Sequence, residues 1–365
     1  APRSLPKPVK EMGGVREWLW KAPQSSSSSS SDSHEGSSSS SSSDSEDGWE
    51  GEATIEVLVN NPRGEMDLRH NLTIREHGGR FEVADERIEN EKPYPGHSQP
   101  FYHYNFRRGH PVLREMLKGQ TEQERPLPRE QILPEESILS QIRDPERYPT
   151  LTHLHEKYSK MRLFRNWSFG PGSLLRREQG THGSNDFLED GGENLALVLS
   201  RIRSGELIRS LKMLYDGIDD LSFNIQTGGI QLCVDEEGGG SRKIPATRLS
   251  DGTLRYLCLL AILLHPEPPP LVAIEEPELG LHPDVIPHLA ELLTEASQRT
   301  QLVVTTHSRM LVDALGDQPE SVVVCAKDEG ESRMDRLSAA DLKEWLEKYS
   351  LGDLWSKGEI GGNRW

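Results

Sequence analysis

Two short apolar runs in the C-terminal half of the chain, each ending in polar residues, most constrain the fold. Residues 271–276 are four apolar residues followed by two glutamates, and residues 302–307 are three apolar residues followed by Thr-Thr-His. A helical pattern over 283–297 separates the two runs. Strand, helix and strand in this order predict parallel strands whose C-terminal ends lie at one edge of a sheet. We therefore expect the acids and the histidine to lie close together.

The polar residues at these strand ends suit phosphate chemistry. One of Glu275 and Glu276 can hold Mg²⁺ through water while the other orients an attacking water molecule. The alternative is an acidic, solvated turn, which the following Pro277 also suits. His307 is placed to hydrogen-bond a terminal phosphate or the attacking water, and the alternative for a single histidine is a structural role.

A third polar turn precedes a strongly apolar helical segment over 252–264. The N-terminus of such a helix presents unpaired backbone N–H groups and the positive end of its dipole to an anion. Gly252 lets a phosphate come close, and the hydroxyl of Ser250 can donate to it. The alternative is that Ser250 or Asp251 simply caps the helix.

These motifs together are typical of the second half of a nucleotide hydrolase. The first half is missing, because no Gly-x-x-x-x-Gly-Lys-Ser/Thr loop occurs in the 365 residues.

With its motifs in this order, the chain resembles the ABC-type ATPases of the RecF-like and SMC-like group, and most closely bacterial predicted ATPases labelled AAA-family. Residues 249–253 match the signature motif, 271–276 the Walker B motif, 278–283 the D-loop and His307 the switch histidine. The resemblance implies an α/β fold, a P-loop NTPase head whose parallel sheet is covered by helices. An antiparallel side sheet and a helical insertion complete the expected fold.

The resemblance also implies a function and its residues. ATP binds between two protomers of a homodimer, Mg²⁺ is the cofactor, and the signature of one protomer closes on the nucleotide held by the other. In this scheme Glu275 is the metal-side acid, Glu276 the catalytic base and His307 the phosphate sensor. Glu275 stands where most relatives have aspartate.

The nucleotide-binding residues that the resemblance implies are Ser250, Asp251 and Gly252, which act in trans, and Gln141, which is matched to the Q-loop glutamine. The missing P-loop removes several charge-assisted hydrogen bonds of about 1.5–3 kcal/mol each, whereas a micromolar ligand has only about 8 kcal/mol in total. We therefore expect this chain to be inactive alone and to bind ATP poorly, with the parent reading frame supplying the missing strand, loop and helix.

Composition shifts along the chain predict six segments. They are a remnant of the N-terminal ATPase lobe (1–24), a disordered acidic serine-rich loop (25–48), an antiparallel β subdomain (49–125), a helical insertion (126–220), an ATPase lobe (221–337), and a C-terminal helix and tail (338–365).

Periodicity adds the expected elements. Alternating patterns predict an antiparallel meander over 53–60, 66–76, 80–84 and 99–107. Apolar spacing near 3.6 predicts one amphipathic helix over 194–215, and a last helix is expected over 339–349.

Charge and composition limit where the protein can be located and which partners it can bind. The formal net charge of −17 argues against holding nucleic acid by bulk electrostatics. The three cysteines lack metal-ligand spacing, no apolar run is long enough for a membrane span, and the N-terminus lacks the apolar region of a signal peptide. We expect a cytoplasmic protein with no membrane partner. Family analogy suggests DNA maintenance or defence, through DNA or a DNA-processing protein.

The alternative from another functional class is a non-catalytic interaction module that binds a partner protein through the signature face. A fused nuclease is disfavoured because only 58 residues follow His307. A transporter subunit is disfavoured because the sequence has no typical Ser-Gly-Gly-Gln signature.

Overall fold

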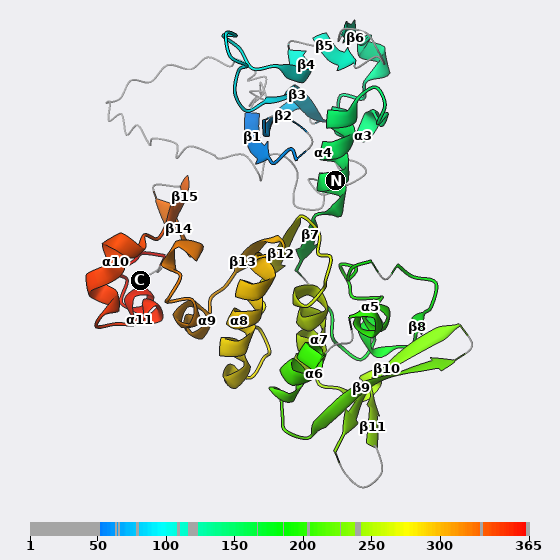
Figure 1. The fold of residues 1–365 in the computed structure, drawn as a ribbon, viewed down its shortest axis with the longest axis vertical. Coiled ribbons are helices and arrows are strands. Elements are labelled where there is room, and N and C mark those ends of the chain that lie inside the picture. The colour runs from blue at the N-terminus through cyan, green and yellow to red at the C-terminus, as the bar shows by residue number, and fades with distance from the viewer. Residues whose placement is uncertain are drawn as a thin grey trace, which may run out of the picture. The chain divides into compact units, whose positions relative to one another are not determined.

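The computed structural model describes residues 52–362 apart from short gaps (Figure 1). The gaps are 63, 65, 78–79, 108–109, 116–122, 166, 185, 203–204, 227, 238–241 and 329–330. The predicted lobe remnant (1–24), the serine-rich loop (25–48) and the end of the tail (363–365) lie outside the described residues. The described residues divide into two compact units, residues 52–159 with 331, and residues 160–328 with 332–362.

A six-stranded sheet with strands in sequence order makes up most of the first unit. Its strands are β1 (Glu52–Val59), β2 (Leu68–His77), β3 (Arg80–Asn90), β4 (Tyr102–Arg107), β5 (His110–Glu115) and β6 (Gln123–Pro126). Every neighbouring pair is antiparallel, which confirms the predicted meander for β1 to β4, whereas β5 and β6 were not foreseen. Leu68 on β2, Ile88 on β3 and Tyr104 on β4 are buried, as expected for a sheet with one covered face.

Two helices pack against this sheet, α3 (Ile138–Gln141) and α4 (Pro149–Lys160), and a short 3-10 turn, η1 (Arg129–Gln131), precedes them. The buried carboxylate of Glu86 on β3 anchors the start of α3. It accepts hydrogen bonds from the Ser137 hydroxyl at 2.5 Å and from the Ile138 N–H at 2.9 Å. His70 lies 3.1 Å from the same carboxylate and stacks on Tyr158, and burial raises the pKa of Tyr158 to about 12. Because every buried polar group in this cluster has a partner, we assign the cluster a structural role.

A three-stranded parallel sheet lies at the centre of the second unit, in the order β13, β12, β7. Its strands are β7 (Arg162–Phe164), β12 (Leu271–Glu275) and β13 (Gln301–Thr305). The helices α7 (Asp251–Leu263) and α8 (Ile286–Ser297) pack into the same core, with a 3-10 turn, η4 (Pro283–Val285), before α8. Val272 and Ile274 point into this core. The parallel pairing of β12 with β13 confirms the central prediction, whereas β7 was not foreseen.

A second, antiparallel sheet pairs β9 (Ile218–Gln226) with β10 (Gly229–Glu236). Strands β8 (Gln179–Gly180) and β11 (Arg242–Pro245) complete it.

The single helix expected over 194–215 is wrong. The segment forms two helices, α5 (Leu195–Arg201) and α6 (Gly205–Lys212). Gly205 begins the second helix, and glycine is an unfavourable residue inside a helix because it loses the most backbone entropy on folding.

The C-terminal elements begin with α9 (Arg309–Ala314). A separate two-stranded sheet follows, made of β14 (Val323–Asp328) and β15 (Glu331–Arg336). The last predicted helix ends earlier than expected, as α10 (Ala339–Leu346), and α11 (Leu351–Ser356) comes after it. The remaining 3-10 turns are η2 (Leu174–Arg176), η3 (Ala246–Arg248) and η5 (Pro319–Ser321). Across the described residues, no helix combines the length and apolar character that crossing a membrane requires.

Candidate functional site

The ends of β12 and β13 bring an acid and a histidine together. Glu275 pairs with Thr305 in the sheet, and the Glu276 N–H donates to the Thr305 carbonyl at 2.9 Å. His307 follows the end of β13 by two residues, and its Nε2 lies 3.5 Å from Oε1 of Glu276. The histidine side chain is 84% exposed and that of Glu276 is 29% exposed. The site is therefore open on the histidine side.

Glu276 has an unusual backbone conformation. Its φ is +43°, and no other non-glycine residue in the described part of the chain has a positive φ. The left-handed region costs a residue with a Cβ about 1–2 kcal/mol. The Glu276 carbonyl accepts hydrogen bonds from Arg255 Nη1 at 2.9 Å and from the Leu279 N–H at 3.2 Å. Strain of this kind persists only where the surroundings fix the backbone, and it concentrates at functional sites.

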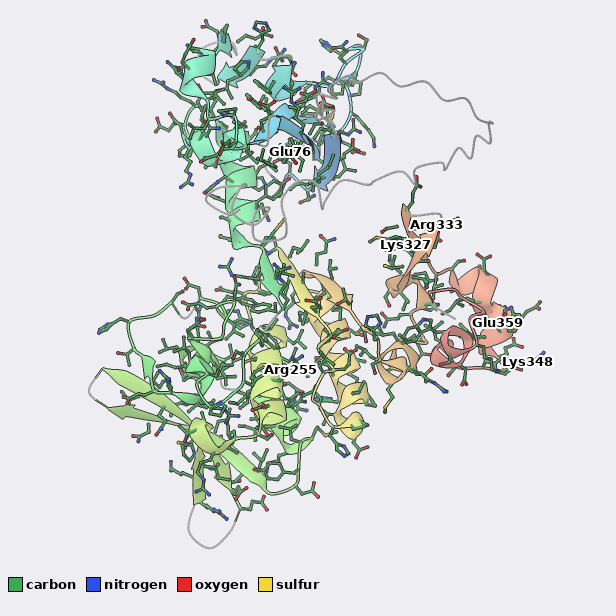
Figure 2. The ribbon with its side chains drawn as sticks, turned by 180° about the vertical axis from the view of Figure 1, so that it is seen from behind. Glu76, Arg255, Lys327, Arg333, Lys348 and Glu359 are labelled. Carbon is green, nitrogen blue, oxygen red and sulfur yellow. The ribbon has the colours of Figure 1, made fainter. Side chains whose placement is uncertain are left out.

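Arg255 links helix α7 to this strained residue, and Figure 2 shows it within the body of the second unit. Its guanidinium lies 5.6 Å from the ring centre of Trp167 and 5.4 Å from that of Phe169. Burial lowers the pKa of Arg255, and the nearby charges of Glu278 and Glu276 oppose that effect. The guanidinium stays charged at neutral pH, so its bond to the Glu276 carbonyl is charge-assisted.

We expect Arg255→Ala to lower the free energy of unfolding by about 2–3 kcal/mol, because it removes a charge-assisted hydrogen bond and a contact with two aromatic rings. Arg255→Lys, which keeps the charge but not the planar fork, should recover part of this loss. Urea unfolding of both variants measures the effect, and Arg248→Ala at an exposed position of η3 is the control. Equal losses in Arg255→Ala and Arg248→Ala would show that Arg255 does not hold the strand end.

Glu278, in the predicted D-loop, ties the two strand ends together. Its Oε1 accepts hydrogen bonds from the Thr306 hydroxyl at 2.5 Å and from the His307 N–H at 3.1 Å. Its Oε2 is buried and has no hydrogen-bond partner among the described residues. Glu278 lies within the matched D-loop, 278–283, but was not among the predicted site residues. Its position two residues after the strand-end acid was the available signal.

The predicted signature motif, 249–253 (below, the signature turn), lies against the predicted D-loop, 278–283, of the same chain. Ser250 is the N-cap of α7, and its hydroxyl oxygen accepts from the Thr253 N–H at 3.0 Å. A Cβ on Gly252 would lie 2.5 Å from the carbonyl oxygen of Gly280, which itself has a φ of +71°. Only glycine allows this approach. The structure therefore confirms that Ser250 caps the helix, and it brings Gly252 next to the loop that follows Glu276.

Gln141 belongs to α3 of the first unit, whereas the other predicted site residues belong to the second unit. Its side-chain amide accepts from the Leu133 N–H at 2.8 Å and donates to the Glu136 carbonyl at 2.9 Å. The amide thus closes its own loop, and its role as a Q-loop glutamine stays a prediction.

Comparison with known proteins identifies the family of the chain. The family described as "AAA domain, putative AbiEii toxin, Type IV TA system" matches residues 25–313. The chain belongs to this family. The search of curated proteins found no match to this chain.

Solved structures similar to this AAA domain include heads of SMC proteins. The Smc head with a coiled coil and joint from Pyrococcus yayanosii has 19% identity and a TM-score of 0.32, over 41% of this chain and 29% of that chain. This chain therefore spans less than a third of that relative. The SMC head from Thermotoga maritima has 13% identity and a TM-score of 0.30, over 74% of each chain. The Pyrococcus furiosus Smc head, bound to the C-terminal domain of ScpA, has 12% identity and a TM-score of 0.34, over 77% of this chain and 80% of that chain.

Mg²⁺ is the cofactor that an ATPase family implies, and the donors at the strand end fit it. The buried Oε2 of Glu278, which has no hydrogen-bond partner among the described residues, is one such donor, and the Glu276 carboxylate beside His307 is a second. Mg²⁺ prefers such hard oxygen ligands and keeps waters and substrate phosphates for most of its shell. No group of three or more potential protein ligands occurs among the residues described. Bound Mg²⁺ would neutralise phosphate charge.

Proposed function

We propose that this AAA domain is an ATPase head that binds and hydrolyses MgATP between two copies of the protein. The observation that carries the proposal is the strained Glu276, held beside His307 at the ends of two parallel strands. This is where α/β sheets bind ligands. The packing of Gly252 on Gly280 supports the proposal, because it joins the signature turn to the loop that follows the strand-end acid.

In this proposal each residue has a task that its position permits. Glu276 accepts a proton from the attacking water, since backbone hydrogen bonds on both of its peptide groups fix its backbone at the strand end and its carboxylate lies beside His307. The exposed imidazole of His307 donates to the terminal phosphate. Ser250, Asp251 and Gly252 face the nucleotide held by the other copy, and Glu275 lies on the metal side. Gln141 keeps its proposed role as the Q-loop residue.

The location, the oligomeric state and the extent of the ATPase lobe belong to the same proposal. The protein works in the cytoplasm as a homodimer, and residues 221–337 form its ATPase lobe. Because the net charge is −17, we propose that any link to DNA runs through a DNA-processing protein more than through bulk electrostatic attraction.

The sequence contains no P-loop lysine, so we expect these 365 residues alone to bind MgATP weakly. The test compares this chain with a longer version in which a P-loop segment precedes residue 1. Calorimetry measures MgATP binding, and light scattering measures dimerisation.

Binding and dimerisation of the longer version alone would support the full proposal. Turnover by the 365-residue chain would support the ATPase but contradict its expected inactivity. If neither version binds MgATP but the chain forms a stable complex with a partner protein, the interaction module on the signature face is the better function.

A further inference from the structure

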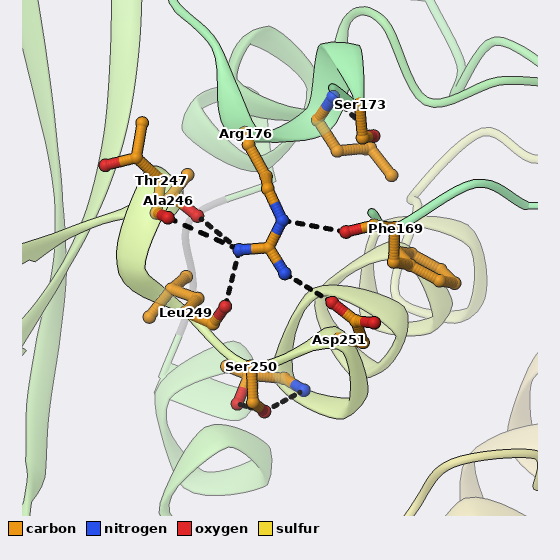
Figure 3. Close-up of polar contacts among 10 residues, drawn as sticks. Phe169, Ser173, Arg176, Ala246, Thr247, Leu249, Ser250 and Asp251 are labelled. Atoms are coloured by element: carbon orange, nitrogen blue, oxygen red, sulfur yellow. Dashed lines mark hydrogen bonds and ion pairs between the residues drawn. The ribbon is translucent and has the colours of Figure 1, made fainter. Parts of the chain in front are cut away.

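One buried arginine outside the predicted motifs holds the whole signature turn. Arg176 lies at the end of η2, some 70 residues before the turn, and its side chain is 11% exposed. Figure 3 shows its guanidinium at the centre of the contacts, with the turn on one side and Phe169 on the other. The side chain donates to backbone and carboxylate oxygens from both sides.

The guanidinium donates in three directions. Its Nη1 donates to the carbonyl oxygens of Leu249 at 2.6 Å, Ala246 at 3.3 Å and Thr247 at 3.5 Å. Its Nε donates to the Phe169 carbonyl at 2.7 Å. The three carbonyls that Nη1 contacts belong to η3 and to the residue before the N-cap of α7. One side chain therefore fixes the path of the chain into the helix. Arginine is suited to this task because its five N–H donors have a fixed planar geometry.

The third direction is an ion pair. Nη2 of Arg176 donates to the carboxylate of Asp251, the first residue of α7. Asp251 is 66% exposed, so its charge would otherwise stand free beside Ser250 and Gly252. A free carboxylate in a helix's first turn repels a phosphate that approaches the N–H groups there. The pairing draws this carboxylate to the arginine side.

We propose that Arg176 is a positioning residue for the signature turn. It holds the backbone of 246–251 and neutralises Asp251, so that a turn with an acid in its middle can receive the phosphates of a nucleotide held by another copy. The inference rests on the proposed ATPase function and names a residue outside its motifs.

The same contacts connect the signature turn to the strand-end site. Phe169 accepts from Arg176 through its carbonyl, and its ring lies 5.4 Å from the guanidinium of Arg255. Arg255 in turn donates to the carbonyl of Glu276. Two arginines that contact the same residue therefore hold the two ends of the proposed site.

Hydrogen exchange on the 365-residue chain without nucleotide tests the clamp directly. The amides of Leu249 and Thr253 are the probes, because both are hydrogen-bonded within the turn. We expect Arg176→Ala to speed their exchange at least about tenfold, and Arg176→Lys, which keeps the charge and is the milder change, to do so less. Arg177→Ala, at the exposed neighbouring position, is the matched control and should leave both amides unchanged. Unchanged exchange in Arg176→Ala overturns the clamp.

Kinetics of the version with a P-loop segment test the positioning role. We expect Arg176→Ala to lower kcat about 10- to 100-fold with KM nearly unchanged, since the turn acts only after closure. Adding Asp251→Asn should recover part of kcat, because it removes the unpaired charge. A kcat unaffected by Arg176→Ala, or no recovery by Asp251→Asn, overturns the positioning role. Absence of MgATP turnover in the unsubstituted protein instead contradicts the proposed function, while the exchange result still decides the clamp.

Discussion

We expect Glu276→Gly to raise the free energy of unfolding by about 0.5–1 kcal/mol while strongly reducing ATP turnover. A non-glycine residue at φ +43° costs about 1–2 kcal/mol, and the extra freedom of glycine in the unfolded chain takes back only part of that. The lost contact with His307 adds little, since the histidine is 84% exposed. Turnover should fall about 10²- to 10⁴-fold, the usual contribution of a general base.

Two further variants separate strain from chemistry. Glu276→Gln keeps the strained backbone, so its stability should stay within about 0.5 kcal/mol of the parent while turnover falls equally. Glu275→Gly, one residue earlier in extended β12, should lose about 0.5–1 kcal/mol. Urea unfolding of the 365-residue chain measures stability, and phosphate release by the version with a P-loop segment measures turnover. Destabilisation by Glu276→Gly would remove the case for strain, and persistent hydrolysis in Glu276→Gln would remove Glu276 as the base.

The strand ends could be predicted from sequence because their signal is local. Four apolar residues before Glu275 and three before Thr305 define strands by themselves, and the helix between them dictates parallel pairing. The proximity of Glu276 and His307 follows from that pairing. The left-handed φ of Glu276 does not, because no glycine or asparagine marks the position.

The two arginines could not be found in the same way. Arg176 lies about 70 residues from the turn that it binds, in a segment rich in charged residues, and each of its carbonyl acceptors is a backbone atom without a sequence signature. Arg255 stands within the apolar face of α7, where a charged residue among buried neighbours was a usable signal. The three-residue strand β7 was also too short to show a periodicity.

The prediction of one helix over 194–215 was wrong for a different reason. The apolar periodicity was correct, but the helix is interrupted. Leu199 and Leu207 are both fully buried, so the apolar spacing did report a covered face. The two helices share that spacing across the break at Gly205. A glycine in the middle of a helical pattern indicates a break in the helix, even where the apolar spacing continues across it.

We expect Gly252→Ala to lower the free energy of unfolding by about 1–3 kcal/mol and to prevent MgATP-dependent dimerisation of the version with a P-loop segment. Alanine in a helix normally gains up to about 1 kcal/mol over glycine. Here the new Cβ would lie 2.5 Å from the Gly280 carbonyl oxygen, which belongs to backbone and cannot turn aside as a side chain can. Overpacking of this kind costs about 1–3 kcal/mol. The steric term therefore outweighs the propensity gain, and the turn and the D-loop must separate.

Gly205→Ala at the start of α6 is the matched control for this prediction. A Cβ there meets no atom within 4 Å, so only the propensity term acts and the variant should gain about 0.5–1 kcal/mol. Opposite signs for two glycine-to-alanine changes, each in the first turn of a helix, would show that contact with Gly280 decides the outcome at Gly252. A gain at both positions would mean that the D-loop yields freely, and the close packing of signature turn and D-loop would then carry no weight in the proposed closure.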